Sequence, residues 1–397
     1  MNSPATFRYA AMNEIKYPFL DLATVNQRYA AAMHDAAVHV IDSGRYIGGE
    51  TVISFERQMA ETVGAPFCVG VSNGLDALRL ILLAWQELGR LHKGDGIIIP
   101  ANTYIASVLA AVQAGLRPVL VDPDHLTHNL TAEAIERACD ADNSIKAVMP
   151  VHLYGRVTWD RNIAASVRRR NLLAVEDAAQ AIGAIAVSPG LFDSRKAGAL
   201  GHAAAFSFYP TKNIGAVGDA GAVVTHSKEL ADAVHALANY GSDTRYHNIY
   251  CGLNCRLDPI QAAMLSVKLP DTQGANARRF ERAVAYNNVI SHPLVIKPLI
   301  SPQVTDSVWH QYVIRVTGGR RDDMRRYLAA QGVATDIHYP VPPHLQPCFK
   351  TLVHSPLPVT EQLATEVLSL PISDCTTVAD AAAIARILNR FPISQHL

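Results

Sequence analysis

The chain has 397 residues, of which 49% are hydrophobic and 18% are charged, and its 35 basic residues balance its 35 acidic ones. This composition is typical of a globular protein large enough for two domains, and it excludes a disordered chain. A net charge near zero provides no general attraction to nucleic acid or to an acidic membrane surface, so we expect neither as a partner.

Residues 1–16 form a polar, mixed N-terminal extension without an apolar run of the length that a signal peptide or a membrane span needs. The 6 cysteines are too sparse for a disulfide framework and fit reduced thiols, so we expect a cytoplasmic protein. Cys251 and Cys255 lie near His247 and could form half of a metal site. No second ligand pair stands at zinc-like spacing, and we therefore expect no metal.

Seven short apolar runs alternate with amphipathic stretches between residues 60 and 240, a pattern that indicates repeated strand-helix units and a mostly parallel sheet. Their nearly continuous apolarity suits strands that are covered on both faces. The predicted strands are 68–71, 97–99, 119–122, 147–151, 173–176, 204–208 and 222–225.

The pattern changes after residue 257. A long helical stretch over 258–288 is followed by proline-interrupted segments, a strand over 312–316, and helices over 321–331 and 378–390. We therefore predict a large α/β domain over 17–257 and a smaller α+β domain over 258–397.

The first candidate site segment is Val71-Ser-Asn-Gly-Leu-Asp76, where a predicted strand turns into an amphipathic helix. Parallel sheets bind ligands beyond the carboxyl ends of their strands, and a helix N-terminus with a glycine is a natural seat for a phosphate. Many such turns carry Asn-Gly for their geometry alone, and that alternative stays open here.

Two further segments end predicted strands with polar groups. Asp177 follows Glu176 at the end of one strand and precedes Gln180, and a helix N-cap is the alternative role for this acid. Lys212 follows another strand in a Pro-Thr-Lys turn, among apolar and aromatic neighbours that could lower the pKa of its amine and make it nucleophilic. Together these segments place a phosphate-binding turn, an acid, an amide and an amine at one edge of the sheet. Pyridoxal phosphate requires groups of these kinds.

Motifs along the chain resemble those of the DegT/DnrJ/EryC1/StrS family, whose members are fold-type-I, aspartate-aminotransferase-like enzymes that use pyridoxal phosphate, mostly on nucleotide sugars. The resemblance runs in order from about residue 17 to the C-terminus. The motifs are Ser43-Gly-Arg-Tyr-Ile-Gly-Gly49, Ser72-Asn-Gly-Leu-Asp-Ala-Leu78, Pro100-Ala-Asn-Thr-Tyr104, Val151-His-Leu-Tyr-Gly155, Glu176-Asp-Ala-Ala-Gln180, Phe206-Ser-Phe-Tyr-Pro-Thr-Lys-Asn213 and Asn254-Cys-Arg-Leu-Asp-Pro-Ile-Gln-Ala262.

The resemblance implies a role for each matching residue. Lys212 would hold the cofactor covalently and move the proton, Asp177 would pair with the ring nitrogen, and Gln180 would bond the phenolic oxygen. Tyr104 would stack on the ring, with a core aromatic as its alternative role. The phosphate would be bound by the backbone of Gly74 and Leu75 and by the hydroxyl of Ser207.

The resemblance also implies a homodimer, because Asn254 matches an asparagine that reaches the cofactor of the neighbouring subunit. The retained Lys212 implies transamination, with L-glutamate as the usual amino donor. Tyr209, His338 and Tyr339 match best the branch that acts at C-3′ of dTDP-linked 3-keto-6-deoxyhexoses, where they would contact the sugar.

Three alternatives remain open at this point. Amination could occur at C-4 of a nucleotide sugar or on a cyclitol ketone, and a remote possibility is a regulatory protein that binds the cofactor without turnover. His338 could instead be a structural histidine in a loop shaped by prolines.

Overall fold

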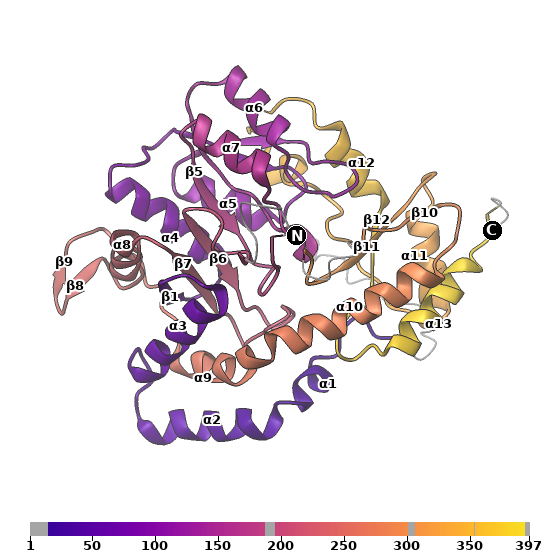
Figure 1. Cartoon of the computed structure of the whole chain (residues 1–397), viewed down its shortest axis with the longest axis horizontal. Helices are drawn as coiled ribbons and strands as arrows, with labels where there is room; N and C mark the ends of the chain where they lie inside the picture. Colours follow the sequence, from indigo (N-terminus) through magenta and orange to yellow (C-terminus); the bar gives the residue numbers. More distant parts are fainter. Residues whose placement is uncertain (1–14, 187–194, 301–305, 353, 394–397) are drawn as a thin grey trace, which may run out of the picture.

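The computed structural model describes residues 15–186, 195–300, 306–352 and 354–393, so the predicted extension lies outside them apart from residues 15 and 16 (Figure 1). Its centre is a seven-stranded sheet in the order β1-β7-β6-β5-β4-β2-β3. These strands are β1 (Phe67–Val71), β2 (Gly96–Pro100), β3 (Arg117–Val121), β4 (Ile145–Val148), β5 (Leu173–Asp177), β6 (Ala203–Ser207) and β7 (Gly221–Thr225).

All seven predicted strands are confirmed within a few residues, and the sheet is mostly parallel as expected. Only β7 runs against its neighbours, since it pairs antiparallel with both β1 and β6. The carboxyl ends of β1, β2, β5 and β6 therefore lie at one edge of the sheet. This is the edge at which open α/β sheets bind their ligands.

Helices cover both faces of the sheet because alternate residues of a strand point to opposite sides. Helices α4, α5 and α8 pack on one face, and α3, α6, α7 and α9 pack on the other. Their bounds are α1 (Leu22–Gln27), α2 (Ala30–Ser43), α3 (Glu50–Val63), α4 (Gly74–Glu87), α5 (Ile105–Gln113), α6 (Ala132–Ala141), α7 (Arg161–Arg169), α8 (Lys228–Ala238) and α9 (Pro259–Lys268), with a 3-10 turn η1 at Leu153–Gly155.

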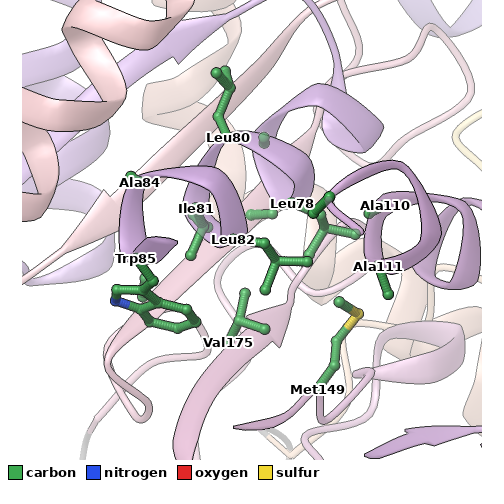
Figure 2. Packing of buried hydrophobic residues seen from close by; sticks show 14 of the residues in the cluster. Leu78, Leu80, Ile81, Leu82, Ala84, Trp85, Ala110, Ala111, Met149 and Val175 are labelled. Atoms are coloured by element: carbon green, nitrogen blue, oxygen red, sulfur yellow. The ribbon is translucent and has the colours of Figure 1, made fainter. Parts of the chain in front are cut away.

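Helix α4 lies at the centre of the first core, which is the apolar cluster between the large sheet and α4, α5 and α8. Asn73 caps it by accepting a hydrogen bond of 2.8 Å from the backbone N–H of Asp76. Figure 2 shows side chains of α4 meeting those of α5 above Met149 and Val175, a residue of β5. The fully buried Trp85 and its neighbours fix this helix, and hence its N-terminus, against the sheet.

A second, smaller sheet in the order β10-β11-β12 has its own core. Figure 1 shows it beside α10, α11 and α13, at some distance from the large sheet. The remaining elements are β8 (Ser242–Thr244), β9 (His247–Asn248), η2 (Leu269–Asp271), α10 (Thr272–Val289), β10 (Val295–Ile296), β11 (Tyr312–Val316), α11 (Arg321–Ala330), η3 (Pro343–Leu345), η4 (Pro347–Phe349), α12 (Pro358–Glu366), β12 (Val367–Leu370) and α13 (Val378–Asn389).

The domain boundary at residues 257 and 258 stays a prediction. Helix α9 packs against α2 and α3 of the first unit, and its residue Leu265 lies in a core shared with the large sheet. Tyr17 packs in the core of the second unit, although it comes first in the described chain. None of the helices in the described ranges has the length and apolar character needed to cross a bilayer.

Candidate active site

The N-terminus of α4 has unoccupied hydrogen-bond donors, since the first N–H groups of a helix have no acceptor within it. Gly74 begins α4 so close to β6 that a Cβ at this position would lie 2.7 Å from the Cβ of Ser207. Glycine is therefore required here, and its absence of a side chain brings the partly exposed Ser207 to the helix N-terminus. The Leu75 side chain packs against the first core, which leaves only its backbone for a ligand.

Asp177 ends β5 in a buried position and is held by hydrogen bonds. Ser107 Oγ donates to Asp177 Oδ2 at 2.7 Å, and the backbone N–H of Ala179 donates to Oδ1 at 3.2 Å. The segment after Asp177 is a series of turns without a helix, so the alternative of an N-cap is wrong. Sequence reasoning missed Ser107, because only the packing of α5 against α4, β2 and β3 brings it to this carboxylate.

Glu176 points to the other face of β5 and takes no part in the site. It is fully buried and accepts backbone N–H groups from Gly198, Leu200 and Gly201 at 2.7 to 2.8 Å. His152 Nε2 lies 2.8 Å from its Oε2. Glu176 therefore holds the backbone of residues 198–201, just before β6, whereas Asp177 faces the site.

Lys212 lies in a tight turn between β6 and β7. Its backbone N–H donates to the carbonyl of Tyr209 at 2.8 Å. Gly215 makes the turn possible, because a Cβ there would lie 2.3 Å from the carbonyl oxygen of Pro210. Burial lowers the pKa of the Lys212 amine to about 8, although the nearby Asp177 carboxylate opposes this shift.

Gln180, Tyr339 and Tyr104 form one side of the site. Gln180 Oε1 accepts the backbone N–H of Tyr154 at 2.6 Å, and this bond turns Nε2 toward Tyr339, whose hydroxyl lies 3.2 Å away. The ring centroids of Tyr104 and Tyr339 are 5.2 Å apart. Tyr104 is 54% exposed, so it is not a core aromatic, and its ring is free to contact a ligand.

His338 and Tyr209 border the lysine. His338 Nδ1 lies 2.8 Å from Ser369 Oγ, and its ring stacks on that of Phe19 with 6.0 Å between centroids. Burial lowers the pKa of His338, and the positive charge of Lys212 contributes to the shift. Tyr209 is 52% exposed and lies at the rim.

Asn254 is the predicted residue that lies apart from this cluster. It is exposed and forms an isolated bridge with Asn239, while the next residue, Cys255, accepts the backbone N–H of Ser72 at 3.0 Å. Its segment thus runs beside the turn that precedes α4, with the asparagine on the surface.

The residues present fit pyridoxal phosphate. The partly buried Lys212 lies near a carboxylate, an oriented amide and an exposed aromatic ring, and a helix N-terminus with a hydroxyl lies on the same sheet edge. Across the described ranges, no three His, Cys, Asp or Glu side chains are grouped so that they could hold a metal ion.

Known proteins match nearly the whole chain. The DegT/DnrJ/EryC1/StrS aminotransferase family matches residues 28–389. A dTDP-3-amino-3,6-dideoxy-alpha-D-galactopyranose transaminase of Aneurinibacillus thermoaerophilus is 42% identical over 374 residues, which are 94% of this chain and 99% of that protein. A UDP-2-acetamido-2-deoxy-3-oxo-D-glucuronate aminotransferase of Pseudomonas aeruginosa is 35% identical, with 89% of this chain and 94% of that protein covered.

A solved structure matches equally well. The crystal structure of DesV from S. venezuelae in complex with a ketimine intermediate has a TM-score of 0.86 and 38% sequence identity to this chain. The match covers 94% of this chain and 97% of that one.

Proposed function

The chain belongs to the DegT/DnrJ/EryC1/StrS aminotransferase family as a sugar aminotransferase that uses pyridoxal phosphate, and we propose a specific reaction for it. It transfers the amino group of L-glutamate to the C-3′ keto group of a dTDP-3-keto-6-deoxyhexose. The products are a dTDP-3-amino-3,6-dideoxyhexose and 2-oxoglutarate. The observation that carries the proposal is a lysine of lowered pKa beside a buried, hydrogen-bonded aspartate.

In this proposal the chain holds the cofactor at both ends. The backbone of Gly74 and Leu75 and the hydroxyl of Ser207 bind the phosphate, where the helix dipole favours negative charge. Asp177 pairs with the ring nitrogen, and Ser107 keeps that carboxylate in place. Gln180 bonds the phenolic oxygen through Nε2.

The chemistry needs one group that moves a proton in both directions. Bound pyridoxal phosphate supplies an aldehyde and a ring that takes up electron density from a substrate carbon. Lys212 provides the amine, which takes a proton from one carbon and returns it to another. A pKa near 8 suits this role, because a group works best as both base and acid when its pKa lies near the working pH.

Support for the sugar comes from the relatives and from the rim of the site. The Aneurinibacillus relative is named for a dTDP-3-amino sugar and the Pseudomonas relative for a 3-oxo sugar, so both names point to position 3 while the nucleotides differ. Tyr104 and Tyr339 face each other beside Gln180, and His338 and Tyr209 both lie close to Lys212. We assign Tyr209, His338 and Tyr339 to the hexose.

We further propose a homodimer in which Asn254 of one subunit reaches the cofactor phosphate of the other. Its exposed position outside the cluster supports this role. The free cysteines of the described chain support action in a reducing compartment such as the cytoplasm.

The decisive experiment incubates the purified protein with L-glutamate and either 3-keto or 4-keto dTDP-sugars, and NMR then identifies the aminated carbon. Amination at C-3′ supports the proposal. Amination only at C-4, or of a cyclitol ketone, would replace it with the alternative substrate class. If glutamate leaves the visible absorbance of the bound cofactor unchanged, a regulatory protein that only binds the cofactor becomes the better explanation.

A further inference from the structure

A cavity of about 560 Å³ opens beside the lysine turn. Its walls come from the N-terminal segment with Phe19, from Thr211 next to Lys212, from Arg279 of α10 and His310, and from Asp336 and His338. This volume is within the range of small-molecule sites. None of the cofactor contacts proposed above uses Arg279 or His310.

A chain of hydrogen bonds fixes which nitrogen of His310 carries its proton. Asn276 Nδ2 donates to the Ile182 carbonyl at 2.9 Å, so Asn276 Oδ1 must be the acceptor for Asn213 Nδ2, also at 2.9 Å. Asn213 Nδ2 gives its second hydrogen to the Val308 carbonyl at 3.0 Å. Its Oδ1 is therefore left as an acceptor, and His310 Nδ1, at 3.1 Å, must be the donor.

The remaining nitrogen of this ring is an unprotonated acceptor. Burial and the positive charges of Lys212 and Arg279 hold the pKa of His310 well below its usual value, so the ring is neutral. With the hydrogen on Nδ1, Nε2 carries a lone pair on the opposite edge of the ring. In the described part of the chain no side chain or backbone group donates to it.

Arg279 adds a positive charge that no acid neutralises by contact. Its neighbours Arg278 and Arg282 both pair with Asp374, whereas no carboxylate in the described ranges forms an ion pair with Arg279. Its Nη1 donates to the carbonyls of Trp309 and His310 at 3.2 Å and also to that of Ile372. Burial lowers the pKa of Arg279 to about 10, which leaves the guanidinium charged at neutral pH.

We propose that this cavity receives the amino donor as an α-amino acid zwitterion, whose ammonium group donates to His310 Nε2 and whose carboxylate is attracted by Arg279. This inference rests on the proposed aminotransferase function. An acceptor and a cation beside one lysine match the two charges of an amino acid. The keto-sugar carries neither an ammonium nor a carboxylate. The two substrates therefore share Lys212 and the neighbouring His338, while His310 and Arg279 recognise the charges of the donor.

The test uses His310→Asn in the cofactor-loaded protein. The asparagine amide can replace Nδ1–H toward Asn213, but it supplies nothing in place of Nε2. Calorimetry with L-glutamate on the protein loaded with pyridoxamine phosphate, which has no aldehyde to condense with the donor's amine, measures donor affinity with the ammonium group intact. We expect the dissociation constant to rise about tenfold to a hundredfold, the effect of one hydrogen bond to a charged group. Glutarate, which lacks the ammonium group, should bind within about threefold of its affinity for the unchanged protein.

Two controls separate recognition of the donor from general damage. His292→Asn removes another buried imidazole, which bonds the Phe391 carbonyl in the second core, and should leave both affinities unchanged. The half-reaction of the 3-keto dTDP-sugar with the protein that holds pyridoxamine phosphate should proceed at a normal rate in His310→Asn, because this sugar has no ammonium group. Arg279 is not substituted, because its carbonyl contacts make its loss a folding defect as well.

Three results would overturn the inference. Equal weakening of glutarate and of the amino acid would show that the ammonium group is not what His310 recognises. An equal loss in the sugar half-reaction would make His310 a positioning residue for Lys212. Unchanged affinity for the amino acid would place the donor elsewhere. If the unchanged protein reacts with neither amino acids nor amino sugars, the proposed function itself fails, and the two failures are thereby distinguished.

Discussion

At the scale of single residues, the Asp177 carboxylate depends on a neighbouring hydroxyl. Ser107→Ala removes the 2.7 Å bond that holds Oδ2. A hydrogen bond to a charged group contributes about 1.5–3 kcal/mol, and we expect a loss of this size in the stability of the cofactor-loaded protein. Denaturant unfolding of loaded and cofactor-free protein measures it, and turnover should fall about tenfold or more. Asp177→Asn is the comparison, because it should abolish turnover while a contact with Ser107 remains possible. If Ser107→Ala turns over as fast as the unchanged protein, Ser107 does not hold the Asp177 carboxylate in place for the reaction.

The lowered pKa of Lys212 predicts how the cofactor-free protein responds to pH. Its amine should react with pyridoxal phosphate at a rate that rises with pH around a midpoint of about 8, and not near the 10.5 of an ordinary lysine. Between these two values the unfolded chain binds more protons at this site than the folded chain does. The free energy of unfolding therefore increases with pH across this interval.

Stopped-flow absorbance measures the uptake rate, and urea unfolding at several pH values measures the stability. Lys212→Met is the control, because it lacks the titrating group and should lose this contribution to the pH dependence. A midpoint above 10 would show that the folded chain leaves the amine in a water-like environment.

The sequence predicts a site residue only where the residues next to it along the chain indicate its role. Lys212 and Asp177 follow or end apolar strands, where a charged side chain is costly to desolvate unless a partner compensates it. The structure places both residues at one edge of the sheet. Ser107 and His310 carry no such local signal. Each acquires its partner through tertiary packing, since Ser107 lies 70 residues from Asp177 and His310 lies 97 residues from Asn213.

At the scale of elements, apolar periodicity identified each strand of the large sheet because both faces of those strands are buried. It did not identify the antiparallel direction of β7, which depends on pairing with β1 and β6. The predicted helix over 258–288 is broken into α9, the 3-10 turn η2 and α10. Pro270 lies within that turn, where a proline lacks the N–H that a continuous helix requires.

Amide substitutions of the two adjacent acids of β5 should have different effects, one on stability and the other on turnover. Thr158 N–H donates to His152 Nδ1 at 3.0 Å, so the Nε2 of this histidine is a donor, and all four partners of Glu176 donate to it. In Glu176→Gln either orientation of the amide turns its NH₂ toward two donors. We expect the free energy of unfolding to fall by about 3 kcal/mol or more.

Urea unfolding checks this prediction, with the visible absorbance of the bound cofactor as a second measurement. That absorbance should be retained in Glu176→Gln. The matched variant Asp177→Asn should lose turnover and keep most of its stability, because the two side chains lie on opposite faces of β5. Loss of cofactor binding in Glu176→Gln at temperatures where the protein stays folded would contradict this division.

At the scale of the whole molecule, the first described residues of the chain pack against the second unit, and no local sequence pattern predicts this contact. Tyr17 forms a bridge with Val333 and packs in the second core, while Phe19 stacks on His338 at the site. Asn213 and Asn276 connect the lysine turn to α10. The second unit therefore supplies one wall of the site, and the Lys212 turn contacts both units.

The proposed exchange of Asn254 between subunits predicts that two inactive proteins restore activity when mixed. Lys212→Ala lacks the amine, and Asn254→Ala lacks the phosphate contact. If Asn254 acts across the interface, a mixed dimer has one site with both changes and one site with neither. With random exchange about half of the dimers are mixed, so activity should reach about a quarter of that of the unchanged protein. Denaturation and joint refolding of the two variants provide the exchange, and separately refolded samples mixed just before the assay are the control. If Asn254 acts within its own subunit, each mixed dimer has one change in each site, and activity stays at the mean of the two parents.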